Sequence, residues 1–482
     1  MKTKALGIGV LVAATAACGG NKALTPGSGS AGSTGSGTAG HLGSNGGAVG
    51  TGGAGGGFGI FIEQGINRNV DVVFMVDDSA GMSVTQAKLA SAISTYFDVL
   101  KGLPGGLPNL HVGVISSSMG AGRNPSIDHC PQGGDQGIFH TKPLGATCAK
   151  ASLNAGQNFL ISVNGQSNFT GDIADVFSCI SLLGVGGCGF EHQLESVLRA
   201  LGADGAPAPP QNANFLRADA YLQVVLLTDE DDCSAPPDSD LFDSSSMTVS
   251  DPLGPLQSYR CNEFGHLCGG KRPPRQPMGE VDLGTCVSAE DGRLLRVADI
   301  VTALKRLKAD PTKVMVAAIT GPPKPYKVNV GPSQVKGDPS MWPYVEFSCI
   351  QNEPDNSQTF AAPSVRVTQL INAFGSNGLF ANLCTPTFVA PLQKIAGQIA
   401  QVMGAPCFPD GADPSKCHFV DTVTDPNGNP QNTPLPRCTD ASDPGPCWDV
   451  GASNGACAQP IVTRRPGGPV TTDAYTTVTC TP

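Results

Sequence analysis

Short apolar runs rich in β-branched residues alternate, from residue 60 onward, with longer segments in which apolar residues recur at helical spacing. The runs are nearly continuous in apolar residues, which is typical of strands covered on both faces by helices. We expect these strands at 70–76, 110–116, 221–228 and 314–320. Strands that alternate with helical segments indicate an α/β fold, doubly wound around a mostly parallel sheet.

Four segments of helical period lie between and after the strands, at 83–100, 190–201, 294–304 and 389–402. Ser83 followed by Gln86 has the pattern of a capping box, so we expect it to begin the first helix. Gly202 follows the second segment directly and is the expected stop of that helix. The α/β domain is predicted to span 60–404.

Residues 230–292 and 321–363 show neither the apolar runs expected of strands nor the helical spacing of apolar residues. They are rich in Pro, Gly, Asp, Ser and Cys and are far longer than ordinary connections, so we expect disulfide-bonded insertions. After residue 404 the pattern changes to closely spaced Cys, Pro, Gly and Asp. We expect 405–482 to form a small, Cys-rich, β-rich module that depends on its crosslinks.

The first residues of the chain predict export. A basic start and a short apolar run lead to Ala16-Ala17-Cys18, which is typical of a secretory signal at 1–17. Cys18 resembles the lipidated cysteine of bacterial lipoproteins, although Thr15 stands where that pattern usually has Leu. The alternative is a plain signal peptide with Cys18 near its cut. Residues 18–59 are then a lipid anchor and a flexible Gly/Ser-rich linker.

The composition supports export and excludes one class of partner. The 17 cysteines suit an oxidising compartment, and setting Cys18 aside leaves an even number for disulfides. The closely spaced pairs that we expect are Cys179–Cys188, Cys407–Cys417 and Cys438–Cys447. The net charge of -10 argues against nucleic acid as a partner, because its binders are basic.

Polar side chains follow two of the predicted strands at once. Asp77 and Ser79 come after 70–76, and Asp229 comes after 221–228. In open α/β sheets, ligands bind at the carboxyl ends of the strands, so these side chains can meet there. Carboxylates and hydroxyls suit Mg²⁺ or Ca²⁺. Each piece also has a plainer interpretation, since Asp and Ser are common in turns and N-caps, and the acidic run 229–232 is typical of a solvated loop.

These motifs resemble the metal-ion-dependent adhesion site of von Willebrand factor type A (VWA) domains, over about residues 66–403. The resemblance implies a Rossmann-like sheet and a metal ion that a partner's carboxylate completes. Asp77, Ser79 and Asp229 match the family's ligands, whereas Gly81 replaces its second Ser and Cys188 replaces its Thr.

Glu191 lies beside the loop that carries Cys188 and is a candidate replacement ligand. Its plainer role is to favour a helix N-terminus. Glu230 or Asp231 could add another ligand. The remaining alternative is a degenerate site that binds partners without metal.

Enzyme motifs are present but out of context. Residues 184–189 match G-x-G-x-x-G but follow a helical segment, and 451–455 match G-x-S-x-G inside the Cys-rich tail. The Cys and His residues within 261–286 could ligate zinc, but disulfides are the preferred interpretation in an oxidising compartment.

The sequence therefore predicts a lipid-anchored bacterial envelope protein, facing the periplasm or the surface from the outer membrane, because Gly19 lacks the Asp that retains such proteins at the inner membrane. Its predicted partner is a protein or a surface polymer, and it meets the membrane through Cys18. We expect no enzyme activity. The alternatives are a metal-dependent hydrolase that uses the same acidic cluster and a purely structural envelope protein.

Overall fold

The computed structural model describes residues 50–51, 58–64, 67–103, 106–124, 127–141, 152–333, 339–403, 408, 412–424, 430–440, 443, 445–451, 459, 461–464 and 474–480. The predicted signal sequence, Cys18, most of the linker and Cys407 lie outside these residues. No helix in the described part of the chain has the length and apolarity needed to cross a membrane.

A seven-stranded sheet forms the centre of the α/β domain, in the order β18-β13-β9-β3-β4-β6-β7. Its strands are β3 (Asn69–Val76), β4 (Asn109–Ser116), β6 (Leu160–Val163), β7 (Gln166–Ser167), β9 (Tyr221–Leu227), β13 (Val314–Thr320) and β18 (Gly378–Asn382). The pairs from β18 to β4 are parallel, and β6 and β7 pair antiparallel at one edge. Apart from β7, the strands follow the order 3-2-1-4-5-6 along the sheet, which defines a doubly wound α/β fold and confirms the predicted class.

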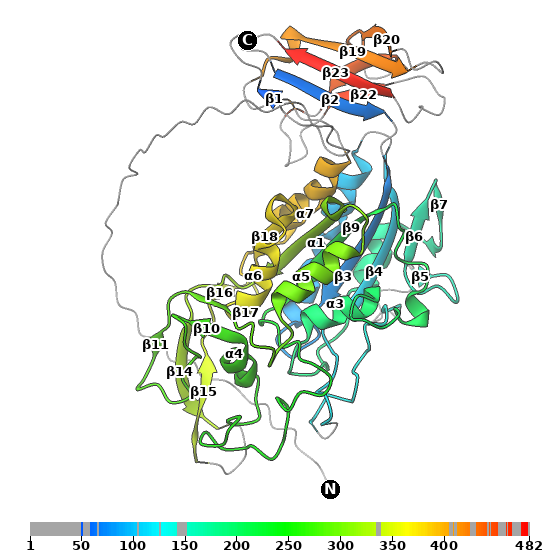
Figure 1. Ribbon diagram of the computed structural model, residues 1–482. Helices are drawn as coiled ribbons and strands as arrows, with labels where there is room; N and C mark the ends of the chain where they lie inside the picture. The colour runs from blue at the N-terminus through cyan, green and yellow to red at the C-terminus, as the bar shows by residue number, and fades with distance from the viewer. Residues whose placement is uncertain are drawn as a thin grey trace, which may run out of the picture. The chain divides into compact units, whose positions relative to one another are not determined.

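Helices cover both faces of this sheet (Figure 1). Along β3, Val72 and Phe74 pack toward α1 (Ser83–Lys101), α2 (Ile173–Ile180) and α7 (Val389–Val402). The alternate residues Val73 and Met75 pack toward α3 (Gln193–Leu201), α5 (Val297–Arg306) and α6 (Val365–Asn372). Burial on two faces explains why the strands read as unbroken apolar runs.

The helices differ from expectation mainly at their N-termini. α7 has the predicted bounds, and Gly202 ends α3 in a left-handed conformation at φ 68°. The capping box is wrong: Met82 is the N-cap residue of α1 and makes no side-chain cap. The Gln86 amide instead donates to the backbone oxygens of Asp77 and Gly184, each at 2.8 Å. The Gln86 side chain, which the local motif predicted as a cap, therefore makes long-range hydrogen bonds instead.

The insertion at 230–292 is built around a buried arginine and an apolar cluster that it shares with Ala121, Cys130, Cys188 and Phe190. It holds α4 (Tyr259–Gly265), β10 (His266–Cys268), β11 (Val281–Asp282) and β12 (Cys286–Ser288). The Arg260 guanidinium donates to the backbone oxygens of Leu241, Asp243, Ser246, Gly254 and Pro255. Cys233–Cys261 and Cys268–Cys286 close the insertion, so the disulfide interpretation of its cysteines is confirmed over zinc.

The insertion at 321–363 carries β14 (Lys327–Pro332) and β15 (Met341–Val345), which extend a sheet with β11. A hairpin of β16 (Cys349–Asn352) and β17 (Gln358–Ala361) follows. The Cys349–Cys384 disulfide holds this hairpin to the segment after β18. Short strands β5 (Ser152–Leu153) and β8 (Phe169–Thr170) pair elsewhere, before α2.

The C-terminal region is β-rich and includes a strand from the start of the described chain. β1 (Gly50–Thr51), β2 (Phe58–Gln64), β23 (Ala474–Cys480), β19 (Cys417–Thr424) and β20 (Pro430–Leu435) form one sheet, and β21 (Cys447–Val450) pairs with β22 (Ile461–Arg464). Figure 1 shows β2 beside β23. Residues from 60 onward were predicted to belong to the α/β domain, whereas residue 60 lies in β2, which pairs with the C-terminal sheet.

Only one of the three expected cysteine pairs forms as predicted, Cys438–Cys447. Cys417 pairs with Cys480, and Cys188 pairs with Cys130. The predictions were wrong because they assumed short loops, whereas folding brings together cysteines 63 and 58 residues apart.

Candidate functional site

The candidate site lies where β3 and β9 end side by side. These are the strands at which the sheet order reverses, and ligands bind at such a switch point in doubly wound folds. The Asp77 amide donates to the Leu227 carbonyl at 2.9 Å and so joins the two strand ends. Asp77 and Asp229 therefore project from neighbouring strands, as the sequence predicted.

Asp77 is fully buried, and both of its carboxylate oxygens accept hydrogen bonds. Its Oδ1 accepts from the Ser79 amide at 2.8 Å and from the Ser117 hydroxyl at 3.2 Å, and its Oδ2 accepts from the Thr228 hydroxyl at 2.6 Å. The Ser79 hydroxyl lies within hydrogen-bonding reach of both Asp77 and Asp229. The structure thus gathers the three predicted strand-end residues at one point.

Asp229 is only 4% exposed, and its Oδ1 has no hydrogen-bond partner among the described residues. Its other oxygen, Oδ2, occupies the space beside Gly81: a Cβ added at Gly81 would lie 2.1 Å from it. The position where the VWA pattern has a second Ser is therefore filled by the carboxylate of Asp229. A buried carboxylate oxygen left without a partner costs free energy unless something else binds it.

Cys188 cannot serve as a ligand, because it forms a disulfide with Cys130. The adjoining loop is held against the strand ends by the Gly187 amide, which donates to the Asp78 carbonyl at 2.8 Å. Three residues after Cys188, Glu191 is 2% exposed and its carboxyl belongs to the same cluster as Asp77 and Asp229. The role of Glu191 as a replacement ligand stays a prediction.

Glu230 brings the cluster to four carboxyl groups, with Asp77, Glu191 and Asp229. Glu230 is partly exposed and is hydrogen-bonded to Glu191. Burial is the main cause that raises all four pKa values, and mutual repulsion raises those of Glu191, Asp229 and Glu230 further. The pKa of Glu230 reaches about 7. The charged groups that raise these pKa values are themselves carboxylates of the cluster.

Asp78 lies beside this cluster without joining it. Its carboxylate contacts the Ser117 hydroxyl at 3.3 Å and fills the space next to Gly187. Burial, followed by repulsion from Asp77 and Asp135, raises its pKa to about 7.

The donor set fits a hard divalent cation. Carboxylate and hydroxyl oxygens converge, the Oδ1 of Asp229 has no partner, and the negative charges lack a counterion, all of which a bound Mg²⁺ or Ca²⁺ would satisfy. Asp77, Ser79 and Asp229 are the residues that would hold it, and Glu191 lies in the same acidic cluster without a contact that places it on the ion. The described residues hold a tighter Cys and Asp group at Cys438, Asp443 and Cys447, but its two sulfurs are joined in a disulfide.

The rest of the acidic run is structural, and its interpretation as a solvated loop is wrong. Asp231 accepts from the amides of Val365 and Arg366 at 2.8 and 2.9 Å, and from His266 Nε2 at 2.7 Å. It thereby caps the N-terminus of α6, which favours negative charge. Asp232 pairs with the Arg366 guanidinium at 2.9 Å, both fully buried.

Sequence reasoning missed Ser117 and Thr228 as parts of the site. Ser117 follows the end of β4, so the same strand-end rule could have found it. The hydroxyl of Thr228 orients Asp77 and also accepts from Gln193 Nε2 at 2.9 Å. The glycine-rich segment 184–189 follows α2, as expected of a loop unrelated to dinucleotide binding.

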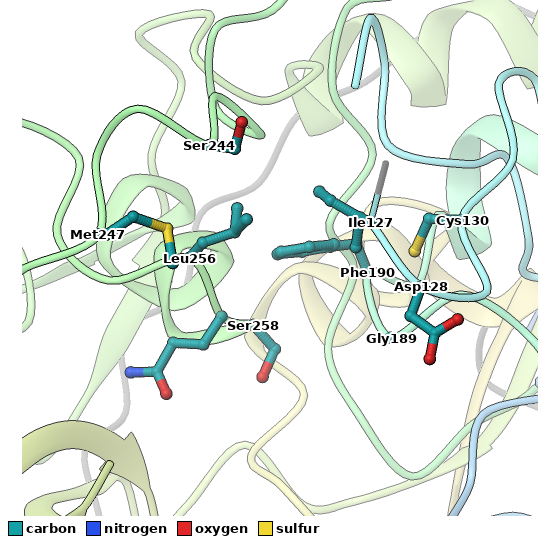
Figure 2. Close-up of a pocket in the computed structure, with 10 residues that line it drawn as sticks. Ile127, Asp128, Cys130, Gly189, Phe190, Ser244, Met247, Leu256 and Ser258 are labelled. Carbon is teal, nitrogen blue, oxygen red and sulfur yellow. The ribbon is translucent and has the colours of Figure 1, made fainter. Parts of the chain in front are cut away.

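A separate cavity of about 490 Å³ lies between the 127–130 loop and the first insertion. Figure 2 shows Ile127 and Phe190 on one side of it, facing Leu256 and Met247 on the other. Asp128, Ser244, Gln257 and Ser258 also line it, and it contains none of the clustered carboxyls.

No protein-family profile matches the chain, and no curated protein matches its sequence. Solved structures that overlap it include the pilus adhesin SpaC from Lactobacillus rhamnosus GG in an open conformation, at 11% identity and TM-score 0.32, over 90% of this chain and 42% of that one. Others are a von Willebrand factor type A protein from Catenulispora acidiphila (10%, TM-score 0.27, 89% and 61%) and three N-terminal domains of the type V pili tip protein Mfa5 from Porphyromonas gingivalis (11%, TM-score 0.26, 88% and 64%). The chain thus spans less than two thirds of each. Overlaps this loose carry no argument about function, and the fold of this chain rests on its own strand order.

Proposed function

We propose that the chain is an exported, lipid-anchored envelope protein whose α/β domain is a binding module. Its strand-end site holds a divalent cation and recognises a protein or a surface polymer. The observation that carries the proposal is the group of buried carboxyls at the ends of β3 and β9, in which the Oδ1 of Asp229 has no partner among the described residues.

Several buried carboxylates elsewhere in the same domain have basic partners. Asp71 is bound by Arg217 at 2.8 Å and by Lys308 at 3.2 Å, and Asp232 is bound by Arg366. An uncompensated buried charge costs several kcal/mol, so such pairing is expected. The strand-end cluster departs from this rule, and either protons or a bound cation must neutralise it. A cation also uses the unpartnered oxygen, which a proton shared between neighbours does not explain.

Each residue of the site then has a distinct task. The carboxylates of Asp77 and Asp229 and the hydroxyl of Ser79 bind the ion from two strand ends, while Ser117 and Thr228 fix the orientation of Asp77. A bound cation supplies a fixed positive charge with coordination positions open to a partner's oxygen atoms. Glu230, which is partly exposed, lies toward the solvent.

The disulfides support a position outside the cytoplasm. The described residues hold Cys130–Cys188, Cys233–Cys261, Cys268–Cys286, Cys349–Cys384, Cys417–Cys480 and Cys438–Cys447. Bonds of this number form and persist in oxidising compartments. The outer membrane as location and Cys18 as the lipid anchor are part of the proposal.

One observation favours a second candidate, a purely structural envelope protein. The three hydrogen bonds of Asp77 are what a carboxylate with only a structural role would make. In that case the cluster stays protonated and binds no ion.

Calorimetric titration of the full-length protein with Ca²⁺ and Mg²⁺ separates the two. We expect saturable binding that Asp229→Asn abolishes and that Asp98→Asn leaves unchanged. Asp98 is an exposed residue of α1 and provides the same change of charge away from the site. Absence of binding to the unsubstituted protein would support the structural candidate instead.

A further inference from the structure

Two aromatic rings stand at the edge of the carboxyl cluster. Phe347 and Phe360 stack with their centroids 4.3 Å apart, and Phe347 is 48% exposed. The Cε2 atom of Phe360 lies 3.5 Å from the position of a Cβ on Gly81, in the loop that carries Asp77 and Ser79. The exposed ring of Phe347 thus lies one stacked ring away from the loop that carries Asp77 and Ser79.

The hairpin that carries the rings is anchored to the site. The amide of Ala362 donates to the carbonyl of Asp229 at 2.8 Å, directly after β17. At the other end, the Cys349–Cys384 disulfide and the ion pair of Lys88 with Glu353, whose side chains are 10% and 7% exposed, fix the hairpin against α1. Rings held in place before binding lose little conformational entropy when a ligand contacts them.

The charge of the site determines which ligand it accepts. Asp77 and Asp229 would supply two carboxylates to the cation, and the carboxyl groups of Glu191 and Glu230 lie close enough to interact with them electrostatically. Two of them, when ionised, already match the charge of a divalent ion. A further carboxylate from a partner would be repelled by those in excess, and more strongly because they are buried. A neutral oxygen ligand avoids this repulsion.

We propose that the site binds a neutral carbohydrate, whose hydroxyl oxygens coordinate the cation while one face of a sugar ring lies against Phe347. Ca²⁺ accepts uncharged oxygen ligands and has coordination positions to spare. The C–H groups of a sugar face carry partial positive charge, which suits the negative face of an aromatic ring. This inference rests on the proposed cation site and specifies the chemistry of its partner.

The test compares neutral polymers with carboxylated forms of the same polymers. Full-length protein is passed over immobilised dextran, mannan and galactan, and over the carboxymethyl derivative of each, in Ca²⁺ and again in EDTA. We expect Ca²⁺-dependent retention on at least one neutral polymer, weakened by carboxymethylation. Retention on the carboxymethyl forms alone would show a carboxylate partner and overturn the proposal, as would no retention on any neutral polymer.

Two exposed aromatic residues give a matched pair of variants. Phe347→Ala should weaken retention on the neutral polymer by about tenfold, because it removes the stacking surface. Tyr344→Ala, an exposed aromatic residue of β15 outside the stacked pair, should leave it unchanged. Equal effects of the two variants would also overturn the proposal.

Calorimetry with Ca²⁺ on the same samples distinguishes the two levels of inference. Ca²⁺ binding without retention on any neutral polymer leaves the cation site standing and removes the carbohydrate. Failure of the protein to bind Ca²⁺ removes both.

Discussion

The carboxylate of Asp229 lies where the side chain of residue 81 would be if that residue were not glycine. The two positions come from different strand ends, and each determines what the other can be. The site lacks the hydroxyl that a Ser at position 81 would supply, and the carboxylate of Asp229 occupies the space beside Gly81 instead. This relationship makes the glycine at 81 testable.

Gly81→Ser should weaken the site, although it brings the sequence nearer to the VWA pattern. The new Cβ would displace Asp229, so we expect Ca²⁺ affinity to fall at least about tenfold and stability to fall by about 1–3 kcal/mol. Gly186→Ser is the control, because a Cβ there meets nothing within 4 Å. Calorimetry and urea unfolding measure both effects. Tighter Ca²⁺ binding in Gly81→Ser would contradict this account.

Stability should fall as pH rises when no cation is present. The pKa of Glu230 is raised to about 7, so between its unfolded value of 4.5 and that pH the folded state holds more protons than the unfolded state. Each pH step in this window then lowers the free energy of unfolding, by roughly 3 kcal/mol in total for Glu230. Urea unfolding in EDTA at about pH 5 and about pH 8 measures this loss.

Saturating Ca²⁺ should reduce that dependence, because the ion stabilises the ionised carboxylates, and Glu230→Gln should flatten it without Ca²⁺. An identical pH profile in Glu230→Gln and in the unsubstituted protein would show that other groups cause the dependence.

Removal of the Cys130–Cys188 disulfide should destabilise the domain. The bond closes a separation of 58 residues, so Cys130→Ala with Cys188→Ala should lower the free energy of unfolding by about 2–4 kcal/mol. The double substitution of Cys438 and Cys447, separated by 9 residues, should cost less. Denaturant unfolding of both variants checks the order, and the reverse order would contradict it.

Arg366 should be far more important than an exposed arginine with a similar ion pair. Arg366→Met leaves Asp232 buried without its partner and should cost about 3–5 kcal/mol. Arg296→Met removes an exposed pair with Asp299 and should cost less than about 0.5 kcal/mol. Equal losses in the two variants would show that burial does not determine the contribution of Arg366.

Cys18→Ala should release the protein from the membrane fraction. If Cys18 carries the lipid, the unsubstituted protein should fractionate with outer membranes and dissolve only in detergent, whereas the variant should appear in the soluble fraction. Immunoblotting of the fractions measures the distribution. A variant that stays with the membrane would remove Cys18 as the anchor.

The sequence predicted most where burial alone decides the structure. The strands that precede Asp77 and Asp229 are apolar throughout because helices cover both of their faces. The ends of these strands, and the proximity of Asp77 to Asp229, could therefore be predicted from the hydrophobic pattern. The bounds of α7 could likewise be predicted from the helical spacing of its apolar residues.

Features that depend on distant parts of the chain escaped sequence analysis. Gln86 has the spacing of a cap but bonds to Gly184, and Asp231 lies in an acidic run but caps α6. Cys188 pairs with Cys130, which is distant in sequence and reaches Cys188 only through the packing of the 127–130 loop. Local spacing carries no information about these contacts, which exist only once the sheet has formed.

The pairing of β2 with β23 has a consequence for the order of events during folding. β23 lies between β2 and β19, so these two strands join one sheet only after β23, the last described strand, has formed. Almost the whole chain separates β2 from β23. Contacts so distant in sequence form slowly. The edge of β2 that faces β23 therefore stays unpaired until β23 has been synthesised, and truncation before β23 would leave the facing edges of β2 and β19 exposed to pairing with other chains.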